Sequence, residues 1–241
     1  MTIPLEIIEL SKTYDTKEAV RDISFKVNEN EIIGILGPNG CGKTTTIGMI
    51  LGLLKPTKGK VLINGIEIEK QRVELLNELN FISPYIELPK KLTVKQNLEV
   101  YGRLYDVKEL GIKIDYLCEK LRLNEFINKI TGELSSGQKN RVSLAKSIIN
   151  DPSVLLLDEP TASLDPETGD FVRSFLEEYQ KEKKTSILLA SHNMAEVERL
   201  CSSVLMMNKG SIIDQGTPEE LIKKHGRKNI CLLYTSPSPR D

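Results

Sequence analysis

The chain has 241 residues, 39% of them hydrophobic, with 33 basic and 34 acidic side chains and a formal net charge of −1, so it can bury a sizeable core as one large domain or two small ones. Basic and acidic residues are mixed along the chain, which provides no basic surface for nucleic acid and excludes nucleic-acid binding as the expected main task. The apolar runs reach only four residues, far below the roughly 20 that span a bilayer.

The N-terminus lacks the basic start and the apolar stretch of about 7 to 15 residues that mark a signal peptide, so we expect the chain to stay in the cytoplasm.

The sequence of the N-terminal part of the chain predicts strands of an antiparallel layer. Residues 3–10 and 20–27 alternate as half-buried strands do. The pair Asn64-Gly65 separates two short apolar segments and predicts a tight hairpin.

Continuous apolar runs predict a second, central sheet. A strand that is buried on both faces loses the polar alternation, and this is typical of parallel sheets covered by helices. The runs lie at residues 32–36, with Gly34 at the centre, and at 154–157, 187–190 and 204–207.

The pattern between residues 93 and 150 is helical. Thr93 and Gln96 form a capping box. One helix face then carries Val94, Leu98, Tyr101 and Tyr105. We expect an inserted helical subdomain at about residues 86–150.

A phosphate loop follows the first continuous run. The residues concerned read GPNGCGKTT and are Gly37, Pro38, Asn39, Gly40, Cys41, Gly42, Lys43, Thr44 and Thr45. They match the pattern GxxxxGK[ST] between a predicted strand and a predicted helix, which is the context that this motif requires. Glycines let backbone N–H groups turn inward around phosphate oxygens, Lys43 reaches the β and γ phosphates, and Thr44 supplies a hydroxyl to Mg²⁺.

The four cysteines Cys41, Cys118, Cys201 and Cys231 lie far apart without a CxxC pair, so we interpret them as reduced thiols. Cys41 is the one of functional interest, because a helix N-terminus and Lys43 next to it favour a lowered thiol pKa and a reactive cysteine. The alternative is an inert small residue at a variable position of the loop.

Two carboxylates end the strand of the segment VLLLDEP, residues 154–160. Asp158 suits the coordination of Mg²⁺, and Glu159 is placed to orient or deprotonate a water that attacks the γ phosphate. A strand that ends in Asp-Glu is by itself more often a solvated strand end. The phosphate loop upstream favours the catalytic interpretation.

The signature segment LSSGQ, residues 134–138, opens a second helix whose N-terminus suits an anion. A plain N-cap explains Ser135 or Ser136 but not Gly137 and Gln138. Two anion-binding helix ends in one chain indicate either two ligands or one ligand shared between two copies of the chain.

The phosphate loop, the signature segment, LLLDEP, ASLD at residues 162–165 and a lone histidine after a strand resemble the nucleotide-binding domain of ATP-binding cassette (ABC) proteins. The likeness is greatest to the ATPase components of ABC-2 type exporters and covers roughly residues 1–225. It implies an α/β fold: a P-loop NTPase core with a mostly parallel sheet, an N-terminal antiparallel β subdomain and an inserted α-helical subdomain, together residues 1–230.

The resemblance also implies roles for single residues. Tyr14 would stack on adenine, with a plain strand-edge tyrosine as the alternative. Ser135, Gly137 and Gln138 would contact an ATP held by the opposite subunit of a homodimer or heterodimer. His192 would sense the γ phosphate beside the catalytic Glu159 and Lys43, with ATP and Mg²⁺ as cofactors.

Two positions depart from the family pattern. Tyr85 stands where a glutamine that joins the Mg²⁺ and water network is expected, and Ser136 replaces the first glycine of the signature. Tyr85, Ile86 and Leu88 lie in the segment SPYIELPKKL, residues 83–92, where the family receives a short cytoplasmic helix of the permease. We therefore interpret them as part of that socket, with closure of the local core as the alternative.

The expected function is that of an ATP-hydrolysing subunit that dimerises on Mg·ATP and powers a separate membrane permease, in export, at the cytoplasmic face of a prokaryotic cell membrane. One alternative is an ATP-switched protein of chromosome maintenance, but Lys43 and Leu134 are too close for its long heptad insertion. Another is the truncated half of a tandem-cassette translation factor.

The tail CLLYTSPSPRD, residues 231–241, does not continue the pattern that precedes it, and its prolines disfavour regular structure. It resembles the translation of a transposon-type adaptor used in DNA sequencing libraries. We interpret it as a non-native, disordered segment. A genuine disordered tail is the alternative.

Overall fold

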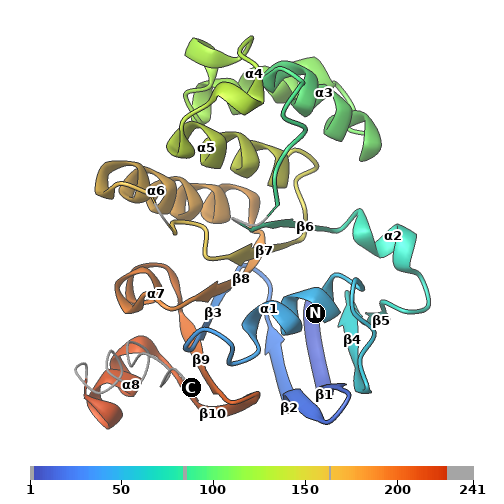
Figure 1. Ribbon diagram of the computed structural model, residues 1–241, viewed down its shortest axis with the longest axis vertical. Helices are drawn as coiled ribbons and strands as arrows, with labels where there is room; N and C mark the ends of the chain where they lie inside the picture. Colours follow the sequence, from blue (N-terminus) through green and yellow to red (C-terminus); the bar gives the residue numbers. More distant parts are fainter. Residues whose placement is uncertain (1–2, 84–85, 163, 227–241) are drawn as a thin grey trace.

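The computed structural model describes residues 3–83, 86–162 and 164–226, which form two β-sheets with helices around them (Figure 1). The predictions about Tyr85 and about the tail fall outside the described residues. None of the described helices is both long enough and apolar enough to cross a bilayer.

The smaller sheet is antiparallel and has the strand order β2-β1-β4-β5. Its members are β1 (Leu5–Tyr14), β2 (Lys17–Val27), β4 (Lys58–Ile63) and β5 (Ile66–Glu67). The predicted hairpin joins β4 to β5: Ile63 pairs with Ile66, and Asn64 and Gly65 both have positive φ angles, 50° and 79°. Two consecutive positive φ angles match the twist of the strands that they connect.

The larger sheet is mostly parallel, as predicted, with the order β10-β9-β3-β8-β7-β6. Only β10 runs antiparallel to its neighbour. The strands are β3 (Ile32–Leu36), β6 (Leu79–Ile82), β7 (Val154–Asp158), β8 (Ser186–Ser191), β9 (Ser203–Asn208) and β10 (Ser211–Gly216).

Helices cover the central sheet, and three of them gather beyond its β6–β7 edge. In Figure 1, α3, α4 and α5 lie together at the top of the view, and the capping box of Thr93 with Gln96 opens α3. The helices are α1 (Lys43–Ile50), α2 (Arg72–Leu76), α3 (Val94–Leu104), α4 (Leu110–Lys120), α5 (Ser136–Ser147), α6 (Pro166–Lys183), α7 (Met194–Leu200) and α8 (Pro218–His225), with short 3₁₀ turns η1 (Asn124–Phe126) and η2 (Thr131–Glu133).

The central strands are apolar throughout because each one serves two cores. Along β7, Leu155 and Leu157 join the core formed with α3, α4, α5 and α6, whereas Val154 and Leu156 join the core formed with β1, β2, β4 and α1. Side chains of a strand alternate between the two faces of a sheet, so a strand covered on both sides needs apolar residues at every position.

Candidate functional site

The phosphate loop leads from the end of β3 at Leu36 to the start of α1 at Lys43. Gly40 and Gly42 have φ angles of 79° and 115°, a region that glycine enters without strain. A Cβ at Gly37 would lie 2.4 Å from the backbone oxygen of Met207, and one at Gly42 would lie 2.7 Å from that of Ala19. The glycines therefore allow the loop to pack against neighbouring backbone.

The Lys43 ammonium is buried inside this loop. Its Nζ donates a hydrogen bond of 2.7 Å to the carbonyl oxygen of Gly37 and lies 3.8 Å from Oε1 of Glu159. A phosphate is a stronger partner for an ammonium than a neutral carbonyl is, because the bond is then charge-assisted at both ends. The loop and its lysine fit the phosphates of a nucleotide.

Thr44 and Asp158 meet at the start of α1 and the end of β7. The Thr44 hydroxyl donates a hydrogen bond of 3.1 Å to Oδ2 of Asp158. Burial raises the pKa of the Asp158 carboxyl, and the hydrogen bond from Thr44 opposes this rise. A hydroxyl and a carboxylate are oxygen ligands of the kind that Mg²⁺ prefers, so this pair fits the ion that accompanies a nucleotide triphosphate.

The Glu159 and His192 side chains are in contact beside the loop. His192 Nδ1 lies 2.7 Å from Oε2 of Glu159, while Oε1 of Glu159 is buried and has no hydrogen-bond partner among the described residues. The Glu159 backbone has a φ of 52°, and its N–H donates to the carbonyl oxygen of Ala190 at 2.9 Å. The carboxylate is thus held by β8 and the following turn and keeps one oxygen able to accept a proton.

Lys43, Thr44, Asp158 and Glu159 line one cavity of about 560 Å³, which we call the phosphate-loop pocket; His192 is not among the described residues that line it. Tyr14 lines this pocket and is 44% exposed. Three basic residues at the pocket had no motif to mark them in the sequence: Lys17, Arg21 and Lys209. The predicted residues that line the pocket are Tyr14, Asn39, Gly40, Gly42, Lys43, Thr44, Thr45, Asp158 and Glu159.

The signature residues lie elsewhere, at the N-terminus of α5. The Ser135 hydroxyl accepts from the Gln138 N–H at 3.2 Å, and the Gln138 side chain accepts from the Ser135 N–H at 3.1 Å. Ser135, Gly137 and Gln138 are not among the described residues that line the phosphate-loop pocket. Within one chain, the two helix N-termini that the sequence predicts to bind anions therefore lie at different places.

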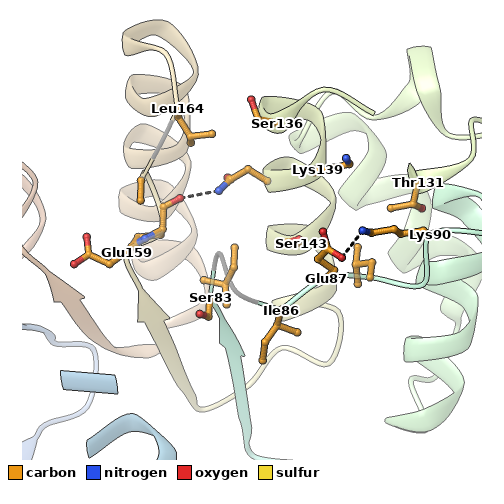
Figure 2. A pocket seen from close by; sticks show the side chains of 15 residues that line it. Ser83, Ile86, Glu87, Lys90, Thr131, Ser136, Lys139, Ser143, Glu159 and Leu164 are labelled. Carbon is orange, nitrogen blue, oxygen red and sulfur yellow. Dashed lines mark hydrogen bonds and ion pairs between the residues drawn. The ribbon is translucent and has the colours of Figure 1, made fainter. Parts of the chain in front are cut away.

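A second cavity of about 280 Å³ lies between α5 and the turn after β7. Figure 2 shows Ser136, Lys139 and Ser143 of α5 on one side of it and Glu159 and Leu164 on the other. The Asn140 side chain donates to the carbonyl oxygen of Pro160 at 2.8 Å. The helix that begins with the signature thus contacts the segment that follows Glu159.

Two expectations from the sequence are corrected. Cys41 is only 2% exposed, and burial raises the pKa of its thiol more than Lys43 lowers it, so a reactive thiolate is not supported. Leu88 is 7% exposed and belongs to a hydrophobic core, as in the alternative of local core closure, whereas Ile86 is exposed.

Comparison with known proteins finds relatives that align with nearly the whole chain. The family model described as ABC transporter matches residues 20–162. The ABC transporter ATP-binding protein NatA of Bacillus subtilis is 33% identical over 239 residues, covering 96% of this chain and 97% of its own. The Nod factor export ATP-binding protein I of Rhizobium johnstonii is 38% identical over 235 residues, covering 96% of this chain and 75% of its own.

A solved structure has the same fold. CbiO1 from Clostridium perfringens, described as part of the ABC transporter complex CbiONQ, superposes with a TM-score of 0.82 at 31% identity, over 94% of this chain and 93% of the other.

Proposed function

This chain belongs to the ABC transporter family as one of its ATP-binding subunits, and from that premise we propose that two such subunits close on Mg·ATP and drive a separate membrane permease in export. The chain is an ATPase, and its alternative assignments outside transport are not favoured, because its relatives are ATP-binding proteins of transporters. The residues around the phosphate loop divide into those that hold ATP and those that hydrolyse it.

ATP is held by the phosphate loop and Tyr14. Backbone N–H groups of the loop and the positive end of α1 face the phosphates, and the Lys43 ammonium exchanges the Gly37 carbonyl for phosphate oxygen. Thr44 and Asp158 would hold Mg²⁺, which supplies charge neutralisation at the phosphates when it is bound. Tyr14 lies at the same pocket and stacks on the base.

Glu159 is the general base, and its geometry is the observation that carries the proposal. One carboxylate oxygen is oriented by His192 at 2.7 Å, and the other is buried without a hydrogen-bond partner among the described residues and faces Lys43 at 3.8 Å. A water between this oxygen and the γ phosphate would lose its proton to Glu159 as it attacks. His192 holds the carboxylate in that orientation and senses the phosphate.

The separation of the signature segment from the phosphate-loop pocket supports the dimer. Ser135, Gly137 and Gln138 sit at a helix N-terminus that can receive an anion, yet they do not line the chain's own pocket. A second subunit, identical or related, would bring its signature segment to this ATP. Two ATP molecules would then lie between two chains.

An exposed apolar groove supports contact with a permease. The groove measures about 320 Å³ and runs between the end of α1, β6 and α3. Leu53 and Leu104 at its rim are 62% and 70% exposed, and clustered exposed apolar residues mark interaction sites. We assign the docking of a cytoplasmic permease segment to this groove, and such docking would hold the subunit at the cytoplasmic face of the membrane. The lining residues are Leu51, Leu53, Leu76, Leu79, Asn80, Phe81, Tyr101, Leu104 and Tyr105.

The variant Glu159→Gln tests the proposal. The amide keeps the size of the side chain but cannot take the proton, so hydrolysis should fall by about 100-fold or more while ATP binding remains. The protein should then elute as an ATP-dependent dimer in size-exclusion chromatography. A variant that turns over at the wild-type rate would refute the role of Glu159, and a monomer at saturating Mg·ATP would refute the shared site.

A further inference from the structure

Glu196, in the first turn of α7, is a glutamate with only 1% of its surface exposed. Each of its two carboxylate oxygens accepts a hydrogen bond from a hydroxyl: Oε1 from Thr161 at 2.7 Å and Oε2 from Ser191 at 2.7 Å. The described part of the chain provides no ion pair to it. A buried carboxylate is costly unless it is well hydrogen-bonded, so these two bonds hold it in place.

The two hydroxyls belong to the two segments that carry the reacting groups. Thr161 follows Glu159 by two residues, and Ser191 directly precedes His192. The Ser191 hydroxyl also accepts the N–H of Asn193 at 3.0 Å, on the other side of His192. One buried carboxylate therefore ties the turn after β7 to the end of β8.

The Glu159 turn needs such support. A non-glycine residue with a φ of 52° is strained, and strained backbone persists only where the surroundings fix it. The Glu159 N–H bond to Ala190 holds one end of the turn. The hydrogen bond from the Thr161 hydroxyl to Glu196 holds the other end.

We propose that Glu196 is a positioning residue for ATP hydrolysis: it clamps Thr161 and Ser191 so that the Glu159 carboxylate and the His192 ring keep their mutual orientation. The inference rests on the proposed role of Glu159 as the base. It assigns no contact between Glu196 and ATP, since Glu196 does not line the phosphate-loop pocket among the described residues.

The first test compares Glu196→Ala and Thr161→Val with the wild type in ATP hydrolysis and in equilibrium ATP binding. Each variant should lower kcat by about tenfold or more, because small displacements of a general base are expensive. The Kd for ATP should change by less than about twofold, because Lys43, Thr44 and Asp158 remain in place. Wild-type kcat in both variants would overturn the clamp.

Val197→Ala is the matched control. Val197 is the next residue of α7, is fully buried and packs near Gly34, so this variant loses core packing on the same helix without touching the clamp. It should lower Tm and leave kcat within about twofold of the wild type. If Val197→Ala lowers kcat as much as Glu196→Ala does, then Glu196 has only a structural role and the proposal is wrong.

Double variants separate positioning from general damage. Adding Thr161→Val to Glu196→Ala should cost little more in kcat, because both remove the same tie, whereas independent sites would give additive losses. In a Glu159→Gln background, Glu196→Ala should not lower the residual rate further. Additive losses in either case would overturn the inference.

Amide hydrogen exchange gives a readout that does not depend on turnover. Glu196→Ala should speed exchange in residues 158–162 and 190–194, and Val197→Ala should not. If the wild type fails to hydrolyse ATP, the proposed function fails and exchange alone decides the clamp. If the wild type hydrolyses ATP and the variants match it in rate and exchange, the clamp fails and the proposed function stands.

Discussion

Burial affects the pKa of a side chain in the site as much as neighbouring charge does. Cys41 sits beside Lys43 at the start of a helix, and both features would lower the pKa of its thiol. Its side chain is packed under the loop, and the loss of water raises that pKa instead. The sequence contains the charges but not the packing, and for this reason it predicts the wrong direction.

We therefore expect the native protein to resist maleimide at Cys41. Labelling followed by mass spectrometry of the peptide that contains Cys41 should give slow modification in buffer and rapid modification in denaturing urea. Mg·ATP should add little protection, because the thiol is already covered. Rapid labelling of the folded protein at neutral pH, with loss of ATPase activity, would restore the reactive-cysteine interpretation.

At the scale of secondary-structure elements, the pattern of apolar residues carries most of the information. The run at residues 154–157 predicts β7 because both sheet faces are covered, and the Asn64-Gly65 pair predicts the β4–β5 hairpin from backbone chemistry alone. Glu196 could not be found this way. A glutamate in the first turn of a helix is normally a solvated residue near a positive helix end, and its burial depends on two hydroxyls that are distant in sequence.

The last helix is tied to its neighbouring strand by charge. Asp214 of β10 pairs with Lys224 of α8, whose Nζ lies 2.7 Å from Oδ2, and also contacts His225 Nε2. Hydrogen bonds from Lys224 and His225 lower the pKa of the Asp214 carboxyl to about 2. A depressed carboxyl pKa stabilises the folded state above the unfolded value near 3.9 and loses this effect as the pH falls toward 2.

Asp214→Asn should accordingly lower the free energy of unfolding at pH 7 by up to about 1 kcal/mol, the usual size for a solvated ion pair. Urea unfolding of wild type and variant between pH 7 and pH 3 should show the difference shrink below about pH 4. Asp115→Asn on α4 serves as a control for charge removal. A difference that stays constant to pH 3 would mean that packing, not the carboxylate, holds α8.

At the scale of the whole molecule, we expect leucine substitutions in the exposed groove and in the buried core to have opposite effects on stability and on permease binding. A double variant Leu53→Ser, Leu104→Ser should keep its stability and basal ATPase activity but fail to co-purify with the permease, because both side chains are solvent-exposed in the free subunit. Leu88→Ala should do the reverse and lose about 2–5 kcal/mol of stability while retaining the complex. If the Leu53→Ser, Leu104→Ser variant co-purifies with the permease at the wild-type yield, the permease contacts another surface of the subunit.

The order of strands in the central sheet has a consequence for how the protein is made. β3 (Ile32–Leu36) lies between β8 and β9, which are encoded about 150 residues later. At synthesis rates of about 5–20 residues per second, roughly 9–34 s pass between the synthesis of β3 and the completion of both neighbours. During that time its apolar side chains lack the strands that later flank them. The nascent chain should therefore depend on chaperones, and the phosphate loop that comes after β3 takes its final position only after β9 has been synthesised.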